Sequence, residues 1–188
     1  MTVGVLTLLL STALCGLYLW IARKANIVDT PNARSSHTRA TPLGGGLPML
    51  LAFFAGLALA FTSVPWPFLY ILIAAIAGCL MLLGVLDDFF ALSVKFRFVF
   101  YATASALASV AILGGQTARV DVHPAVIVAC ASLFVLWMLN LYNFMDGIDG
   151  IAAIQGASAC GFIALLAYAS HPMYALFCAL LGAAQLGF

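Results

Sequence analysis

The chain has 188 residues, of which 65% are hydrophobic and only 7% charged, and its formal net charge at pH 7 is +1. A soluble domain of this length carries roughly 25% charged residues, so the composition excludes that class and indicates an integral membrane protein. The small net charge also excludes the basic surface that a nucleic-acid partner requires. Five cysteines lie within apolar segments and form no CxxC pair, which favours buried thiols over disulfides or metal ligands.

Apolar segments close to the length that crosses ~30 Å of hydrocarbon recur along the whole chain. We therefore expect an all-α bundle of about seven membrane spans, with the seventh truncated, in one integral membrane domain over residues 1–188. The expected spans are residues 3–22, 47–63, 68–86, 98–113, 125–139, 151–169 and 173–188.

The distribution of basic residues predicts the orientation. No Lys or Arg precedes the first span, whereas Arg23 and Lys24 follow it, which indicates a retained helix with its N-terminus outside. The connectors after the first, third and fifth spans then face the cytoplasm. They contain six of the seven Lys and Arg residues, all except Arg119, in agreement with the positive-inside rule.

The first cytoplasmic connector ends in three glycines, Gly44, Gly45 and Gly46, which open the second span. Glycines at a helix N-terminus can expose backbone N–H groups to an anion, and the nearby Arg34 and His37 favour a phosphate. Two alternatives stay open: the glycines form a flexible hinge, and the cations anchor the chain to anionic lipid head groups.

The third span runs into two adjacent carboxylates, Asp87 and Asp88. They oppose the helix macrodipole and repel each other, so something must compensate them. A metal, a cationic substrate, or Lys95 and Arg97 could do so. The alternative is a solvated pair that those two cations neutralise.

The fifth span leads into the segment NLYNFMDGIDG, in which Asn140, Asn143, Asp146 and Asp149 recur at three-residue steps. Polar groups at this spacing share one helical face or one tight turn. Their oxygens suit Mg²⁺ and phosphate, although caps and turns would use the same residue types.

Together the three connectors place carboxylates, amides, cations and a glycine-rich helix start on one cytoplasmic surface. This combination suits phosphoryl transfer, where catalysis depends on positioning and charge neutralisation. A transporter or channel subunit is the alternative class. It would require ionisable groups near the middle of the membrane, and the spans contain almost none.

Three motifs carry a resemblance to a known family: VDTPNARSSHTRATPLGGG (residues 28–46), GVLDDFFALSVKFR (84–97) and NLYNFMDGIDGIAA (140–153). The chain resembles the polyprenyl-phosphate N-acetylhexosamine-1-phosphate transferases, which also include the muramoyl-pentapeptide translocase. The first motif is most similar to the branch that initiates O-antigen and lipopolysaccharide synthesis.

The resemblance implies transfer of N-acetylhexosamine-1-phosphate from a UDP-N-acetylhexosamine to undecaprenyl phosphate, with release of UMP, at the cytoplasmic face of a bacterial inner membrane. It implies Mg²⁺ as the cofactor, with Mn²⁺ as an alternative. A homodimer in the bilayer is one possible assembly, which the sequence does not decide. It also implies that the family's fold continues past residue 188, so we expect this chain to be incomplete and inactive alone. A catalytically inactive fragment is the alternative.

The motifs and the resemblance together define the expected site. Its catalytic residues are Asp87, Asp88 and Lys95, its Mg²⁺ ligands Asn143 and Asp88, and its nucleotide- or phosphate-binding residues Asp146, Asp149, Asn140, Gly44, Gly45, Gly46, Arg34 and His37.

Overall fold

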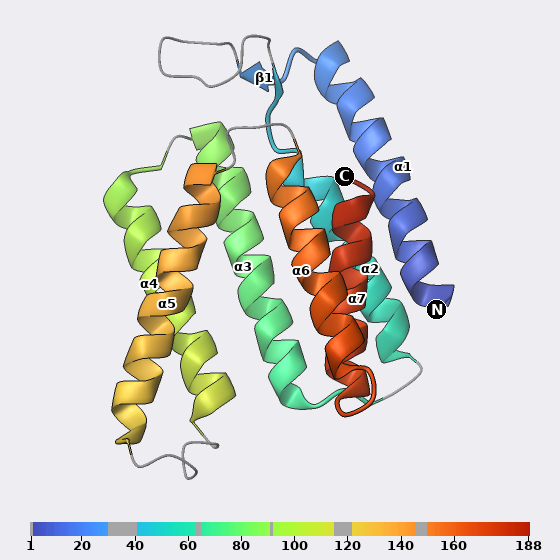
Figure 1. Ribbon diagram of the computed structural model, residues 1–188. Helices are drawn as coiled ribbons and strands as arrows, with labels where there is room; N and C mark the ends of the chain where they lie inside the picture. The colour runs from blue at the N-terminus through green and yellow to red at the C-terminus, as the bar shows by residue number, and fades with distance from the viewer. Residues whose placement is uncertain (1, 30–40, 63–64, 91, 115–121, 146–149) are drawn as a thin grey trace. The chain divides into compact units, whose positions relative to one another are not determined.

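A computed structural model describes residues 2–29, 41–62, 65–90, 92–114, 122–145 and 150–188 (Figure 1). Within these ranges the chain forms seven helices and one pair of two-residue antiparallel strands, so the predicted all-α class is confirmed. The elements are α1 (Thr2–Lys24), β1 (Val28–Asp29), β2 (Thr41–Pro42), α2 (Gly46–Phe61), α3 (Phe68–Phe90), α4 (Val94–Leu113), α5 (Pro124–Met145), α6 (Ile151–Ala167) and α7 (Pro172–Leu186).

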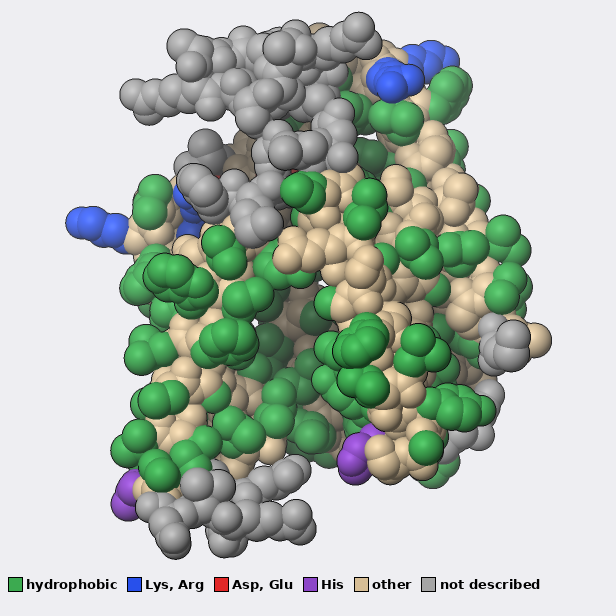
Figure 2. Space-filling model, viewed as in Figure 1, with side chains coloured by type: hydrophobic (Ala, Val, Ile, Leu, Met, Phe, Trp, Pro, Cys, Tyr) green, Lys and Arg blue, Asp and Glu red, His purple; other side chains and the backbone are tan. Residues whose placement is uncertain are grey.

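Four of these helices, α1, α3, α4 and α5, are long and apolar enough to cross a membrane. Helices α2, α6 and α7 are equally apolar in character but contain only 16, 17 and 15 residues. At 1.5 Å per residue they reach about 22–26 Å, which is short of the ~30 Å hydrocarbon layer. Figure 2 shows hydrophobic side chains over the outer surface of the helices, as contact with lipid requires.

The chain divides into two compact units. The first unit comprises residues 1–66 and 145–188, and contains α1, α2, α6, α7 and the strand pair. The second unit comprises residues 67–144, and contains α3, α4 and nearly all of α5.

Small residues allow the helices of the first unit to approach closely. Helix α7 packs against α1, α2 and α6, and the Ser11 hydroxyl of α1 donates a 2.6 Å hydrogen bond to the Ala184 carbonyl of α7. Helix α1 also packs against α2, where a Cβ on Gly56 would lie 2.1 Å from Oγ1 of Thr7. Helices in lipid associate through such small side chains, because apolar burial gives them no advantage over lipid contact.

The second unit has one polar end. Figure 1 shows that α3 and α5 finish, and α4 begins, at the same end of this unit. In Figure 2 the Lys and Arg side chains of the unit that the structure describes also lie at this end. Helix α3 continues four residues beyond its expected span and α5 continues six, because nothing in either extension breaks a helix. Helix α4 begins four residues early, at a cap in which Ser93 Oγ accepts a hydrogen bond from the Phe96 N–H.

Candidate functional site

Asp87 joins the end of α3 to the beginning of α4. Its Oδ2 forms a 2.5 Å ion pair with Nη1 of Arg97, and its Oδ1 accepts a 3.0 Å hydrogen bond from the Leu92 N–H. The Asp87 and Arg97 side chains are only 22% and 28% exposed, so water screens the pair less than it screens a surface ion pair. Of the compensations that the sequence left open for Asp87, the structure therefore provides Arg97.

Asp88 and Lys95, the other predicted catalytic residues, lie at the same end of the second unit. Both are exposed. Asp88 is in the last turn of α3, about 100° around the helix from Asp87, and Lys95 is in the first turn of α4. A carboxylate and an ammonium group are thus accessible to solvent beside the Asp87–Arg97 pair.

The two predicted amides, Asn140 and Asn143, lie in the last two turns of α5, which finishes at this same polar end. Both are exposed, and their three-residue spacing places them on one helical face. The Asn140 side-chain N–H donates to the Leu136 carbonyl at 2.8 Å. Asp146 and Asp149 fall outside the described residues, so their expected convergence with the amides stays a prediction.

The donor chemistry of this end fits a magnesium ion. Asp87 and Asp88 are the only acids whose side chains the structure describes, and no group of three or more His, Cys, Asp or Glu occurs in that part of the chain. Since Asp87 is paired with Arg97, the predicted ligands Asp88 and Asn143 are the donors that would hold the ion. Mg²⁺ is usually held by one or two carboxylates together with substrate phosphates, and this donor set is compatible with that pattern.

The glycine triplet belongs to the first unit, and the structure gives a reason for glycine at two of its three positions. Gly44 has φ 72°, in the left-handed region that favours glycine, and a Cβ on Gly45 would lie 3.1 Å from the Phe188 ring. Gly46 begins α2, and a Cβ there would meet nothing within 4 Å. The Tyr18 hydroxyl donates to the Leu43 carbonyl just before this turn. Phosphate binding at the triplet stays a prediction, and Arg34 and His37 lie outside the described residues.

From the sequence, Arg97 is only one of several candidate counter-charges for Asp87, and the Leu92 amide is not singled out. The Ser93 cap is the sequence signal for Arg97, because it starts α4 early enough to bring Arg97 within reach of Asp87. No sequence pattern indicated the role of the Leu92 N–H, because a backbone contact of this kind depends on the geometry of the connection.

Comparisons with known proteins define the class. Residues 68–188 match glycosyl transferase family 4. The chain belongs to this family, which confirms the resemblance drawn from its motifs.

Individual relatives share a single name. The undecaprenyl-phosphate alpha-N-acetylglucosaminyl 1-phosphate transferase of Yersinia pestis is 35% identical over 177 residues, which cover 86% of this chain and 47% of that protein. The proteins of the same name from Escherichia coli K12 and Thermotoga maritima are 31% and 32% identical over 77% and 68% of this chain, and 40% and 39% of their own lengths. The chain thus spans about half, or less, of the length of the curated relatives that it matches.

Proposed function

We propose that the protein transfers N-acetylhexosamine-1-phosphate from a UDP-sugar to undecaprenyl phosphate and releases UMP, and so begins a cell-surface polysaccharide. One observation carries the proposal: exposed Asp88, Lys95, Asn140 and Asn143 occur together at one end of a unit built from membrane-length helices. The family and the shared name of the relatives support the same reaction. A soluble nucleotide donor and a membrane-embedded lipid phosphate could both reach such a polar end.

In the proposed reaction an oxygen of the lipid phosphate attacks the β-phosphorus of the UDP-sugar. A new P–O bond forms there, the bond from the β-phosphorus to the oxygen bridging the two phosphates breaks, and UMP leaves with that oxygen. Lys95 neutralises phosphate charge as the negative charge shifts to the leaving group. Asp88 and Asn143 would hold Mg²⁺, which, when bound, neutralises charge on the diphosphate.

Asp87 is better suited to positioning than to proton removal. A phosphate monoester has a second pKa near ~6, so the acceptor is already mostly dianionic at pH 7 and gains little from a base. Both oxygens of Asp87 accept hydrogen bonds, from Arg97 and from the Leu92 N–H. We therefore assign Asp87 the role of fixing the connection whose two sides carry Asp88 and Lys95.

The polar end of the second unit is proposed to face the cytoplasm, where UDP-sugars are available. The positive-inside distribution of Lys and Arg supports this orientation, with the first helix entering from outside. The bacterial origin of the relatives supports an inner-membrane location.

The proposal is tested by measuring UMP release from UDP-N-acetylhexosamines, using the full product of the gene that encodes this chain. Release should require both undecaprenyl phosphate and Mg²⁺ or Mn²⁺. Asp88→Asn should reduce it strongly, whereas Arg119→Ala, expected at the opposite membrane face, should not. UMP release without lipid phosphate, or equal losses in both variants, would contradict the proposal. The same assay on residues 1–188 alone tests the expectation that this part is inactive by itself.

A further inference from the structure

Helix α1 of the first unit ends in a cluster of one aromatic and two basic side chains. Trp20 is 61% exposed, and Arg23 and Lys24 in the last turn are exposed as well. One turn beyond Trp20, Arg23 lies about 60° around the helix to one side of it and Lys24 about 40° to the other. The two cations therefore flank the indole ring on one helical face. Figure 2 shows Lys and Arg side chains at this end of α1.

This face of α1 is turned away from the rest of the first unit. The buried residues of the helix are Thr7, Ser11 and Ala22, which lie about 140–200° around it from Trp20. Helix α1 is long and apolar enough to cross a membrane, so the face opposite these buried residues is the one that meets lipid. A tryptophan near the end of a membrane helix lies at the level of the lipid head groups.

The Lys24 ammonium is folded back toward the membrane. Its Nζ lies 4.9 Å from the centroid of the Trp20 ring, one turn nearer to the hydrocarbon. A lysine at a helix end usually extends its ammonium group away from the hydrocarbon and into water. The contact with Trp20 instead keeps this charge at the depth of the indole ring, and hence at the level of the head groups.

Both charges are available to an anion. Neither Arg23 nor Lys24 forms an ion pair with a residue that the structure describes. A phosphodiester between them would accept charge-assisted hydrogen bonds from both side chains. Basic residues beside a membrane helix attract the anionic lipids of the bilayer surface in this way.

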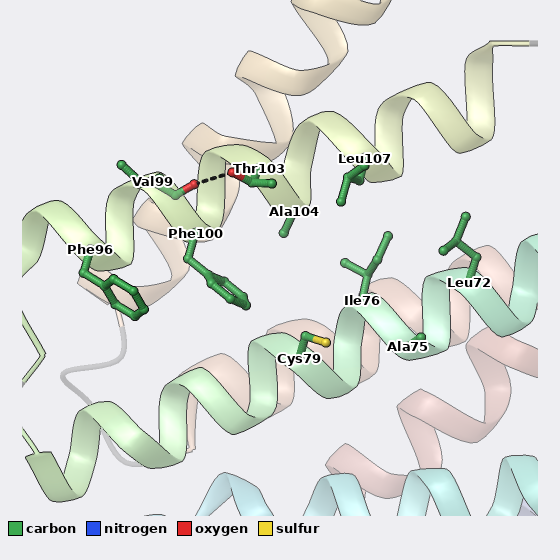
Figure 3. A pocket seen from close by; sticks show the side chains of 10 residues that line it. All are labelled: Leu72, Ala75, Ile76, Cys79, Phe96, Val99, Phe100, Thr103, Ala104 and Leu107. Carbon is green, nitrogen blue, oxygen red and sulfur yellow. Dashed lines mark hydrogen bonds between the residues drawn. The ribbon is translucent and has the colours of Figure 1, made fainter.

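These charges distinguish the end of α1 from the apolar groove between α3 and α4 in the second unit (Figure 3). The 10 side chains that line the groove include no charged residue. Its one hydroxyl, on Thr103, already donates to the Val99 carbonyl of its own helix at 2.9 Å, as the dashed line in Figure 3 shows. Nothing in that lining can select one lipid head group over another.

We propose that the end of α1 binds the head group of an anionic phospholipid, with the phosphate between Arg23 and Lys24 and the glycerol beside Trp20. The partner is a lipid of the surrounding bilayer and takes no part in the proposed reaction. The inference therefore does not depend on the proposed function.

A lipid bound there would fix the depth of one corner of the first unit. The Leu43 N–H donates to the Ile27 carbonyl just past α1 at 3.3 Å, and the Tyr18 hydroxyl of α1 donates to the Leu43 carbonyl. These two hydrogen bonds join the end of α1 to the glycine turn that opens α2, so the depth of one sets the depth of the other.

Fluorescence quenching by brominated lipids measures the preference directly. In the full product of the gene, every tryptophan except Trp20 is replaced by phenylalanine, and the protein is reconstituted in phosphatidylcholine bilayers. Part of the lipid is then replaced, at the same mole fraction, by phosphatidylglycerol or phosphatidylcholine with brominated acyl chains. A basic residue near the membrane surface favours an anionic lipid by roughly fivefold. We expect the affinity for phosphatidylglycerol at Trp20 to exceed that for phosphatidylcholine by about fivefold or more.

A variant that retains only Trp137 is the matched control. Trp137 of α5 is 67% exposed, and α5 contains no Lys or Arg, so the two brominated lipids should quench it equally. The combined substitution of Arg23→Gln and Lys24→Gln should remove the preference at Trp20, whereas Lys24→Arg should retain it. Because loss of both cations can also change the orientation of α1, the unsubstituted pair is measured in 1 M salt as well. The Debye length is then ~3 Å, and the preference should fall at least twofold.

Equal quenching of Trp20 by the two lipids, or the same preference at Trp137, would overturn the inference. A preference that survives the double substitution, or one that 1 M salt leaves unchanged, would overturn it as well. Undecaprenyl phosphate at one-tenth of the phosphatidylglycerol concentration should leave the quenching unchanged. If it abolishes the excess quenching, the site selects a polyprenyl phosphate, and the assignment to a phospholipid is overturned. Since no turnover is measured, none of these outcomes depends on whether the proposed reaction occurs.

Discussion

The ion pair between Asp87 and Arg97 should couple α3 to α4 energetically. Hydrogen bonds to charged groups contribute about 1.5–3 kcal/mol, and exposed ion pairs about 0.2–1 kcal/mol. Because these side chains are 22% and 28% exposed, we expect a coupling free energy of about 1–2 kcal/mol between them. Asp87→Asn keeps an oxygen that can accept from the Leu92 N–H, so Asp87→Ala should cost about 1 kcal/mol more than Asp87→Asn.

The coupling is measured with a double-mutant cycle of Asp87→Asn and Arg97→Gln. Equilibrium unfolding in mixed micelles of increasing dodecyl sulfate content gives the free energy of unfolding of each variant. Trp137, the tryptophan of the second unit, provides the fluorescence signal. If the two single substitutions simply add, the ion pair does not link the helices and the reasoning is refuted.

The same pair separates positioning from proton removal. The exchanged variant, in which Asp87→Arg is combined with Arg97→Asp, should recover part of the stability lost in the single variants. If Asp87 acts by positioning, Asp87→Asn should lower UMP release with an unchanged dependence on pH. Loss of the acidic limb of the pH–rate profile, where a base becomes protonated, would instead identify Asp87 as a general base.

Three further outcomes are expected. Asp88→Asn should lower kcat/KM by an amount equivalent to about 2–4 kcal/mol of transition-state stabilisation, as removal of a preorganised electrostatic group does, while the protein still folds. If the amount of folded protein falls as much as the activity does, a role of Asp88 at the site is refuted. A single cysteine at Ser93 should react only with reagent that reaches the cytoplasm and one at Thr117 with reagent outside, whereas the reverse pattern would invert the topology. Gly56→Leu places a Cβ against the Thr7 hydroxyl of α1 and should lower the free energy of unfolding by about 1–3 kcal/mol. Gly16→Leu has open space around it and should lower the free energy of unfolding little. Equal effects of the two substitutions would refute close packing of α1 against α2.

The positions of the helices could be predicted because each coincides with an apolar run that must avoid water. Their ends could not, because a drop in hydrophobicity marks the edge of the membrane rather than the end of a helix. Helices α3 and α5 continue past that edge, so Asp87, Asp88, Asn140 and Asn143 lie on rigid helical turns instead of on connectors.

The types of residue in the site could also be predicted, because the charge and the hydrogen-bonding groups of each side chain can be read from the sequence without knowing how the helices pack. Their partners depend on how two helices are placed against each other. The sequence left a metal, a substrate or a cation as the counter-charge for Asp87, and only the packing of α4 on α3 selects Arg97.

In the proposed reaction the β-phosphate of the donor moves to the lipid together with the sugar. The full product of the gene is incubated with UDP-N-acetylglucosamine labelled with ³²P at the β-phosphate, undecaprenyl phosphate and Mg²⁺, and the lipid and aqueous phases are counted. We expect label in the lipid phase, in amounts equal to the UMP released. Label that stays in the aqueous phase as UDP while the sugar becomes lipid-linked would contradict it, because the protein would then transfer the sugar without its phosphate.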